Sequence, residues 1–219
     1  ASDVYKRQVW QRLDKSDVEW LVKAADTSRG ALPLFGCIMA RDGLLFTTDR
    51  YRAHALPTHA DMAGTIPAKI AKACGQFDYG FAAERYAIQC DGFTVTGRTE
   101  NGAPDFAKLL PIDAPALFPN TVDLGAVAKS ALTVAKDSLI AFDGASATVR
   151  DSKGRADLAT VPAPAPTHPV TVNARYLADM AMLGATWAQS APTKPVRMDH
   201  GSRVGLLMPV RSACLGSSV

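Results

Sequence analysis

The chain has 219 residues, of which 47% are apolar and 21% charged, and its formal net charge at pH 7 is +3. These proportions are ordinary for a globular protein, so they exclude disorder, collagen and coiled coil as descriptions of the whole chain. The longest strongly apolar uncharged run, 31–40, is far shorter than the ~20 residues of a membrane span. The N-terminus also lacks the apolar segment of a signal peptide. We therefore expect a cytoplasmic protein that does not contact a membrane.

Cysteine and histidine give no sign of a metal centre. The four cysteines form no CxxC pair, and the four histidines are scattered along the chain. Because these spacings match no zinc pattern, we expect free thiols, no metal and no cofactor. Residues 1–8 are polar and aperiodic, and we interpret them as a leader outside the fold. The cysteines are Cys37, Cys74, Cys90 and Cys214.

In the first half of the chain, apolar spacing predicts two helices and two groups of strands. Asp14 is a capping residue, and the residues after it have helical spacing as far as Ala25. A second helix is expected to open at 66–69, with an apolar face that extends to Phe77. The intervening and following runs are strand-like: 34–40, 44–48, 52–56, 86–89 and 93–97.

The second half repeats this order. A helix is expected after Asp123, and another opens at 172–175. Ile66 and Val172 are 106 residues apart, and this offset also aligns Lys69 with Arg175. The sequence therefore predicts an α+β protein made of two tandem repeats, each with two helices packed on antiparallel sheet. The strand-like runs of the second half are 138–142, 147–150, 156–161, 196–198 and 204–210.

The repeat also sets the expected domains. The prolines of 111–120 suit an extended connector between a first domain, 9–110, and a second domain, 121–219. The proline-rich run 162–169 is interpreted as a loop inside the second copy, because a boundary there would leave only 170–219 as a domain.

Cationic residues fall on the side of each predicted helix that lies away from its apolar face. A solvated surface explains any one such helix. Four in a repeat favour one basic surface that binds phosphates without reading base sequence. Glu19, Asp26 and Asp179 dilute the positive charge, so this binding should be weak. The candidate DNA-binding residues are Lys15, Lys23, Lys69, Lys72, Lys129, Lys136 and Arg175.

Four motifs occur in a recognisable order. The turn 48–52 reads Thr-Asp-Arg-Tyr-Arg, and 93–111 contains Gly-Ala-Pro-Asp-Phe and ends in Leu-Leu-Pro. The segment 172–179 reads Val-Asn-Ala-Arg-Tyr-Leu-Ala-Asp, and 206–211 reads Leu-Leu-Met-Pro-Val-Arg. Together they resemble the middle and last domains of the bacterial DNA polymerase III beta subunit, the sliding-clamp family. The resemblance extends over nearly the whole chain from about Val9.

The resemblance implies the DNA clamp fold and a closed ring of six similar domains, with helices lining the hole. Such a ring encircles double-stranded DNA without sequence preference and tethers the replicative polymerase. DNA is then retained because the ring is closed and not because the affinity is high. The expected protein partners are a DNA polymerase and a clamp loader, both bound through short peptide motifs.

The family binds those peptides in an apolar pocket between its middle and last domains. Matching residues of the first half are Leu34, Thr48, Arg50, Tyr51, Arg52, Pro104, Lys108 and Leu109. Matching residues of the second half are Asn173, Tyr176, Leu206, Leu207, Met208, Pro209, Val210 and Arg211. Leu, Met, Pro and Tyr side chains can form an adaptable groove. Plain strand core is an equally good explanation of Leu206, Leu207 and Met208.

This sequence departs from the family at several points. It matches two domains where family members have three, so six domains would require a head-to-tail homotrimer. Arg50 stands where the turn usually has Gly, Ala103 stands where Phe usually precedes Pro104, and Ala68 stands where Arg is common. These changes should alter the detailed shape of the pocket.

Three alternatives remain. The first is a monomeric clamp-fold protein that binds nucleic acid or acts as an adaptor without a ring. The second is a fragment of a chain with a further N-terminal domain. The third is an enzyme, but the sequence contains no nucleophile elbow, phosphate loop or dinucleotide fingerprint, so we expect no catalysis. The residues considered for a catalytic site are Cys90, Asp91, Asp105, Asp199 and His200.

Overall fold

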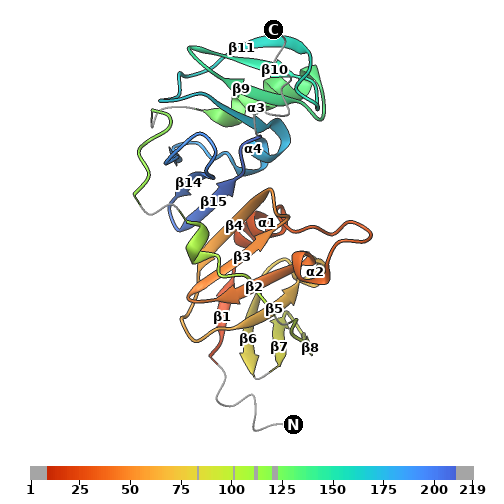
Figure 1. Ribbon diagram of the computed structural model, residues 1–219. Helices are drawn as coiled ribbons and strands as arrows, with labels where there is room; N and C mark the ends of the chain where they lie inside the picture. The colour runs from red at the N-terminus through yellow and green to blue at the C-terminus, as the bar shows by residue number, and fades with distance from the viewer. Residues whose placement is uncertain (1–8, 83, 101, 111–112, 120–122, 211–219) are drawn as a thin grey trace. The chain divides into compact units, whose positions relative to one another are not determined.

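The computed structural model describes residues 9–82, 84–100, 102–110, 113–119 and 123–210 (Figure 1). The chain divides into two compact units, residues 1–109 and 110–219, which we call unit 1 and unit 2 and describe one at a time. The predicted leader 1–8, Arg211 and Cys214 lie outside the described residues.

Unit 1 contains two four-stranded antiparallel sheets and two helices. One sheet has the order β1-β6-β7-β8, with β1 (Gln11–Leu13), β6 (Phe77–Ala82), β7 (Arg85–Cys90) and β8 (Phe93–Arg98). The other contains β4-β3-β2-β5, with β2 (Cys37–Arg41), β3 (Leu44–Thr48), β4 (Arg52–Pro57) and β5 (Gly64–Pro67). The helices are α1 (Lys15–Val22) and α2 (Ala68–Cys74), and the short 3-10 turns are η2 (Pro33–Gly36) and η3 (Ala107–Leu109).

The core of unit 1 holds α1 firmly against the sheet. Trp20 and Leu21 of the helix are buried together with Phe46 of β3. The last turn of a helix leaves carbonyl groups without helical partners. Here the Thr47 hydroxyl donates to the Leu21 carbonyl at 2.5 Å, and His54 Nδ1 donates to the Trp20 carbonyl at 2.6 Å. Side chains of β3 and β4 therefore complete the C-terminal end of α1.

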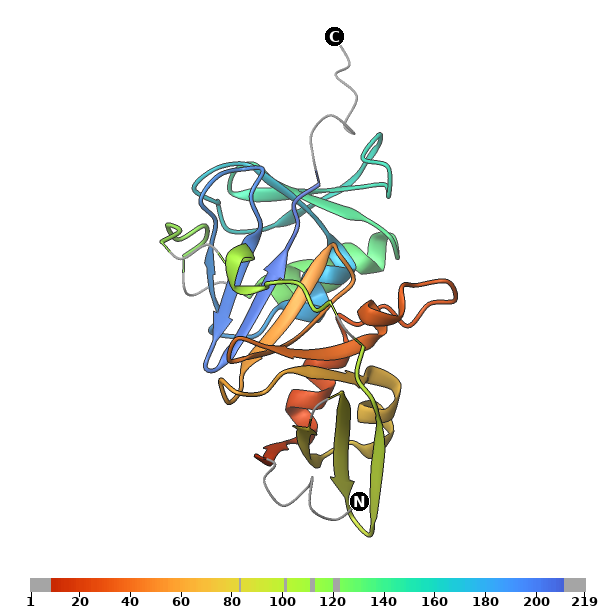
Figure 2. The same cartoon turned by 60° about the horizontal axis from the view of Figure 1, so that its bottom comes forward.

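Unit 2 repeats this plan (Figure 2). One sheet has the order β11-β10-β9-β12, with β9 (Leu139–Phe142), β10 (Ser146–Arg150), β11 (Asp157–Pro162) and β12 (Val170–Asn173). The other contains β13 (Thr186–Ala188), β14 (Val196–His200) and β15 (Arg203–Leu207), all antiparallel neighbours in this order. The helices α3 (Leu124–Val134) and α4 (Ala174–Met180) pack on each other.

Side-chain caps set the starts of both helices in unit 2. Asp123 accepts a hydrogen bond from the Ala126 amide at 3.0 Å, as the capping signal in the sequence predicts. Asn173 accepts from the amides of Arg175 and Tyr176 at 3.0 and 3.2 Å. No helix in the described part of the chain is long and apolar enough to span a bilayer.

The predicted repeat is confirmed in detail. The strand–helix junction of β5 and α2 lies 106 residues before that of β12 and α4, because α2 begins at Ala68 and α4 at Ala174. Residues 163–169 form a loop between β11 and β12, inside the second copy as predicted. Within the predicted connector, the Leu117 amide donates to the Trp187 carbonyl at 2.7 Å, and Ala116 pairs with Ala188. Residues 116–117 are thus bonded to the edge of unit 2.

Several sequence expectations about element boundaries were wrong, and two of them show why. The helix expected to include Phe77 ends at Cys74, because Gly75 has a φ of +76°, and Phe77 begins β6. A positive φ of this kind is adopted readily by glycine and does not continue a helix. The strand expected at 34–40 begins only at Cys37, since Pro33–Gly36 forms η2.

Candidate functional site

Three lysines of unit 1 lie at a groove between its two helices. The groove has a volume of about 330 Å³ and is lined by Lys15, Val18, Glu19, Val22, Lys23, Lys72 and Gly75. Three of the four candidate DNA-binding lysines of this unit therefore share one surface. Glu19 lies among them and reduces the local positive charge.

The fourth candidate, Lys69, lies elsewhere on unit 1. It is exposed and lines a second hollow of about 310 Å³ together with Asp26 and Glu100. Lys23 also differs from its predicted position, because α1 ends at Val22 and Lys23 lies in the following turn. The sequence pattern correctly predicted these side chains to be exposed, but it did not show which of them lie together.

Unit 2 presents fewer cations on its helices. Lys129 is exposed on α3, but Lys136 lies in the turn after α3, which ends at Val134, so its prediction as a helical residue was wrong. Arg175 is exposed in the first turn of α4, and its Nη2 atom lies 3.7 Å from Asp137 Oδ1. Because both partners are exposed, this ion pair is weak and its arginine can exchange partners with a phosphate.

The turn between β3 and β4 is a rigid loop built by its own side chains. Asp49 accepts from the amides of Tyr51 and Arg52 at 3.0 and 2.9 Å, and it also forms a half-buried ion pair with Arg52. Thr48 donates to the Arg52 carbonyl at 2.7 Å. Arg50 has a φ of +78°, a conformation that favours glycine. Its guanidinium carbon lies 5.5 Å from the centre of the Phe35 ring.

This geometry explains the residue pattern of the turn. The left-handed position is the one at which the sequence resemblance expects Gly, and Arg50 occupies it at a conformational cost. Tyr51 is 56% exposed and so is accessible at the surface of the loop. Leu34, which belongs to η2, is half-buried.

A segment after β8 carries the remaining candidates of unit 1. Phe106 is buried and stacks on Phe46 with ring centres 4.9 Å apart. Asp105 accepts from the Lys108 amide and forms an ion pair with Lys108 Nζ at 2.9 Å, which lowers the pKa of Asp105. The Asp105 side chain thus shapes the turn, as the sequence predicts. Leu109 at the end of η3 is 55% exposed, and Pro104 is half-buried.

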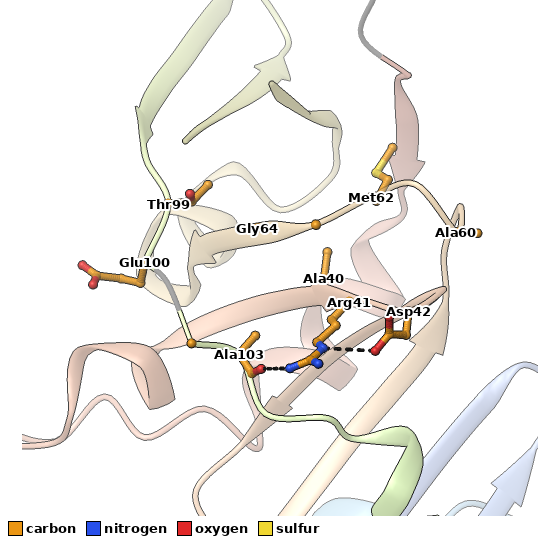
Figure 3. A pocket seen from close by; sticks show the side chains of 11 residues that line it. Ala40, Arg41, Asp42, Ala60, Met62, Gly64, Thr99, Glu100 and Ala103 are labelled. Atoms are coloured by element: carbon orange, nitrogen blue, oxygen red, sulfur yellow. Dashed lines mark hydrogen bonds and ion pairs between the residues drawn. The ribbon is translucent and has the colours of Figure 1, made fainter. Parts of the chain in front are cut away.

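The start of this segment is fixed beside a cavity of unit 1 (Figure 3). Arg41 Nη1 donates to the Ala103 carbonyl at 2.5 Å, and Arg41 Nε donates to Asp42 at 3.0 Å. The cavity has a volume of about 450 Å³. Figure 3 shows that the Glu100 side chain points away from Arg41. The cavity residues are Ala40, Arg41, Asp42, Ala60, Met62, Ala63, Gly64, Thr99, Glu100, Gly102 and Ala103.

The pocket candidates of unit 2 divide into buried and accessible residues. Leu206 and Leu207 are 4% and 0% exposed, as expected for strand core. Met208, directly after β15, is 39% exposed. Tyr176, Pro209 and Val210 are half-buried, and the amide of Val210 donates to the Thr171 carbonyl at 2.8 Å. Asn173 uses its side-chain oxygen in the α4 cap.

Three of the residues considered for catalysis, Cys90, Asp105 and Asp199, are buried or held in ion pairs. Burial raises the pKa of the Cys90 thiol to about 12, so a thiolate nucleophile is strongly disfavoured. In unit 2, Asp199 makes a two-pronged ion pair with Arg197 at 2.7–3.0 Å. Asp105 is engaged by the amide and the Nζ atom of Lys108 within its own turn. Among the described residues, no group of three His, Cys, Asp or Glu side chains could hold a metal ion.

Comparison with known proteins identifies the fold. Neither protein-family models nor curated proteins gave a match. Among solved structures, the DNA polymerase III subunit beta from Borrelia burgdorferi, in complex with a natural product, has a TM-score of 0.73 and 13% identity, covering 96% of this chain and 66% of that chain. Caulobacter crescentus pol III beta has a TM-score of 0.71 and 19% identity, covering 96% of this chain and 68% of that chain.

A third match is the Helicobacter pylori beta clamp bound to a DNA ligase peptide, with a TM-score of 0.66 and 13% identity, covering 92% of this chain and 65% of that chain. The chain therefore has the fold of the DNA sliding clamps. More narrowly, it resembles bacterial DNA polymerase III beta subunits, of whose length it spans about two thirds.

Proposed function

We propose that this chain is the subunit of a DNA sliding clamp, which encircles duplex DNA as a ring and tethers a replicative DNA polymerase in the cytoplasm. The observation that carries the proposal is the sliding-clamp fold across both units. The lysine-lined groove of unit 1 supports it, because Lys15, Lys23 and Lys72 present positive charge from the helix pair. Three two-unit copies supply the six domains of such a ring.

The proposed contact with DNA is electrostatic and independent of base sequence. α1 and α2 have only eight and seven residues, and the lysines lie on the exposed side of the pair. Lysine on a flexible stem can exchange between neighbouring phosphates, because each contact replaces a released counterion and fixes no base. This arrangement suits a protein that moves along DNA.

The proposed peptide site involves the accessible candidates of the two units. In unit 1, these are Tyr51 of the β3–β4 turn and Leu109 of η3. In unit 2, the chief candidate is Met208. Exposed aromatic, leucine and methionine side chains provide adaptable apolar contacts for a short peptide. The DNA ligase peptide bound to the Helicobacter pylori clamp supports a partner of this kind. A polymerase and a clamp loader are the proposed partners.

Topological retention tests the function directly. The protein is loaded by a clamp loader onto nicked circular DNA and then separated from free protein by gel filtration. Cutting the circle at moderate salt should release the protein within minutes, while an uncut circle should retain it. Blocking the ends of the linear DNA with bulky proteins should restore retention. Equal retention on open linear and circular DNA would refute the ring.

A monomeric adaptor with the clamp fold is the second candidate. The extended Asp49-anchored turn and exposed Tyr51 would serve peptide binding without any ring. Light scattering separates the two possibilities, because a clamp assembles to about three chains at micromolar concentration and an adaptor stays at one.

A further inference from the structure

Two cysteines of unit 1 lie close together although they belong to different elements. Cys74 is the last residue of α2, and Cys90 is the last residue of β7. In the turn that leads from α2 into β6, the Gln76 amide donates to the Cys74 carbonyl at 2.9 Å. β6 pairs with β7 so that Asp78 lies opposite Gln89, which places the start of β6 beside the end of β7. The short turn therefore returns the end of α2 to the end of β7.

Both cysteine side chains are on the inner faces of their elements. Along α2, Cys74 follows buried Ala71 by three residues and so shares its face of the helix. Along β7, Cys90 alternates with Tyr86 and Ile88, which are both buried. Each cysteine therefore faces the interior of unit 1 from its own element.

The two thiols are in direct contact. Burial, together with a hydrogen bond to the Cys74 thiol, raises the pKa of the Cys90 thiol to about 12. A disulfide requires two cysteine side chains that are directed toward each other from nearby backbone positions. The end of α2, its turn and the end of β7 provide this arrangement.

The other cysteines are placed differently. Cys37, at the start of β2, is buried, and its Sγ atom donates to the Pro33 carbonyl at 3.4 Å. Cys214 lies outside the described residues. Of the three cysteines that the structure describes, Cys74 is the most accessible, so a dissolved oxidant reaches it first.

We propose that Cys74 and Cys90 are a redox-sensitive pair, which a small organic disulfide such as oxidised glutathione converts to a disulfide that fastens the end of α2 to β7. Disulfides of cytosolic proteins are usually transient, and many serve redox sensing. The pair is a dithiol under reducing conditions and a crosslink after exposure to the oxidant. This inference concerns unit 1 alone and does not depend on the proposed ring.

Two exchange steps form the bond. The Cys74 thiolate attacks one sulfur of oxidised glutathione, and the other half leaves as a thiolate that takes up a proton. The Cys90 thiol then loses its proton to solvent, and its sulfur attacks the Cys74 sulfur and displaces the second glutathione, which is protonated in turn. Two protein thiols are oxidised while one glutathione disulfide is reduced to two thiols. The Cys90 thiolate is scarce, which slows the second step, but contact with Cys74 makes that step intramolecular.

The crosslink stabilises a short helix beside the lysine groove. α2 has only seven residues, and helices of this length depend on packing more than on their own hydrogen bonds. A bond from its last residue to β7 opposes fraying of its final turn. Gly75, the residue after Cys74, lines the groove with Lys72, so the crosslink also fixes one wall of the groove. The closed loop restricts the unfolded chain as well, which raises the stability of the folded state.

Peptide mapping of the full-length chain tests the pair. The protein is incubated with oxidised glutathione at mildly alkaline pH, its remaining thiols are alkylated, and it is digested with trypsin for mass spectrometry. Trypsin separates Cys74, in peptide 73–85, from Cys90, in peptide 86–98. The oxidised sample should give these two peptides as one linked species, which dithiothreitol separates. A link from Cys74 to Cys37, or free thiols at both Cys74 and Cys90, would overturn the proposal.

Single substitutions separate the two exchange steps. Cys90→Ala should stop at a glutathione adduct on Cys74, because the second thiol is missing. Cys74→Ser should leave Cys90 unmodified, because burial shields its sulfur. Cys37→Ala is the matched control at a buried cysteine of the same unit, and it should form the linked species as the unmodified chain does. A glutathione adduct on Cys90 in the Cys74→Ser chain would refute Cys74 as the point of attack.

Thermal unfolding measures the consequence for unit 1. The oxidised chain should melt roughly 10 °C higher than the reduced chain, and Cys74→Ser should show no such difference. Equal melting temperatures with the link present would refute the fastening of α2. A chain that links but is not retained on circular DNA would refute the clamp and leave the pair in place, whereas a chain that is retained but does not link would refute the pair alone.

Discussion

Acidification should destabilise unit 1 through one buried histidine. His54 is 0% exposed, and its ring stacks on Trp20 with centres 3.8 Å apart and planes 7° apart. Nδ1 donates to the Trp20 carbonyl, while Nε2 is buried without a hydrogen-bond partner among the described residues. One donated hydrogen bond and one unpartnered nitrogen are the pattern expected of a neutral imidazole ring. Burial lowers the pKa of His54 from 6.5 to about 3.

The size of the effect follows from proton linkage. Above pH 6.5 the ring is neutral in both the folded and unfolded states, so the full stability is present. Between pH 6.5 and about 3 the unfolded state binds a proton that the folded state excludes, so stability is lost as the pH falls. Each pH unit in this window costs about 1.4 kcal/mol. At pH 5 the loss from His54 is therefore about 2 kcal/mol.

The assay is urea unfolding at pH 7 and pH 5, followed by tryptophan fluorescence. Other groups also titrate, so the informative quantity is the difference between the unmodified chain and His54→Asn. The asparagine amide can still donate to the Trp20 carbonyl, but it takes up no proton. His54→Asn should lose about 2 kcal/mol less than the unmodified chain over this interval. His59→Asn, at an exposed histidine, is the matched control and should behave like the unmodified chain. Identical pH dependence of His54→Asn and the unmodified chain would refute the buried neutral ring.

Three further predictions concern the candidate site. Arg50→Gly should be more stable than Arg50→Ala by about 1 kcal/mol in urea unfolding, because only glycine adopts a φ of +78° without strain; equal stabilities would contradict the left-handed turn. Met208→Ala should weaken binding of a replicative polymerase peptide about tenfold in calorimetry and leave assembly intact. Replacing Lys15, Lys23 and Lys72 by alanine should reduce the salt dependence of DNA binding by up to about 0.9 per lysine lost, and an unchanged slope would remove the groove from the DNA contact.

The fold was largely predictable because both copies carry the same periodicities. Helix starts at Asp123 and before Ala174 and the 106-residue offset could all be derived from the sequence. The short strands β1, β5, β12 and β13 could not, because three or four residues seldom establish an alternation. β6 was missed for another reason: Phe77 continues the helical spacing of α2, and the terminating Gly75 outweighs that spacing.

The exposure of the candidate lysines was predictable from the sequence, but which of them are neighbours was not. Exposure of the lysines follows from helical spacing, yet the separation of Lys69 from the groove depends on how α1 and α2 meet. Sequence reasoning also missed Thr47 and His54, which hold the end of α1 from 26 and 34 residues away. Contacts at that separation have no local pattern. The signal in the sequence that could have pointed to His54 was its position among the apolar residues of the strand-like run 52–56.

The weakness of the basic surface bears on how the protein would hold DNA. Three exposed lysines with Glu19 among them form a modest positive patch, and at physiological ionic strength charges more than about 8 Å apart are largely screened. Such contacts dissociate readily, which permits movement along the duplex but cannot by itself keep the protein there. The lifetime on circular DNA must then be set by how often the ring opens. Replacing Lys15, Lys23 and Lys72 by alanine should therefore shorten that lifetime on circular DNA much less than cutting the circle does, and the opposite order would mean that affinity, not closure, retains the protein.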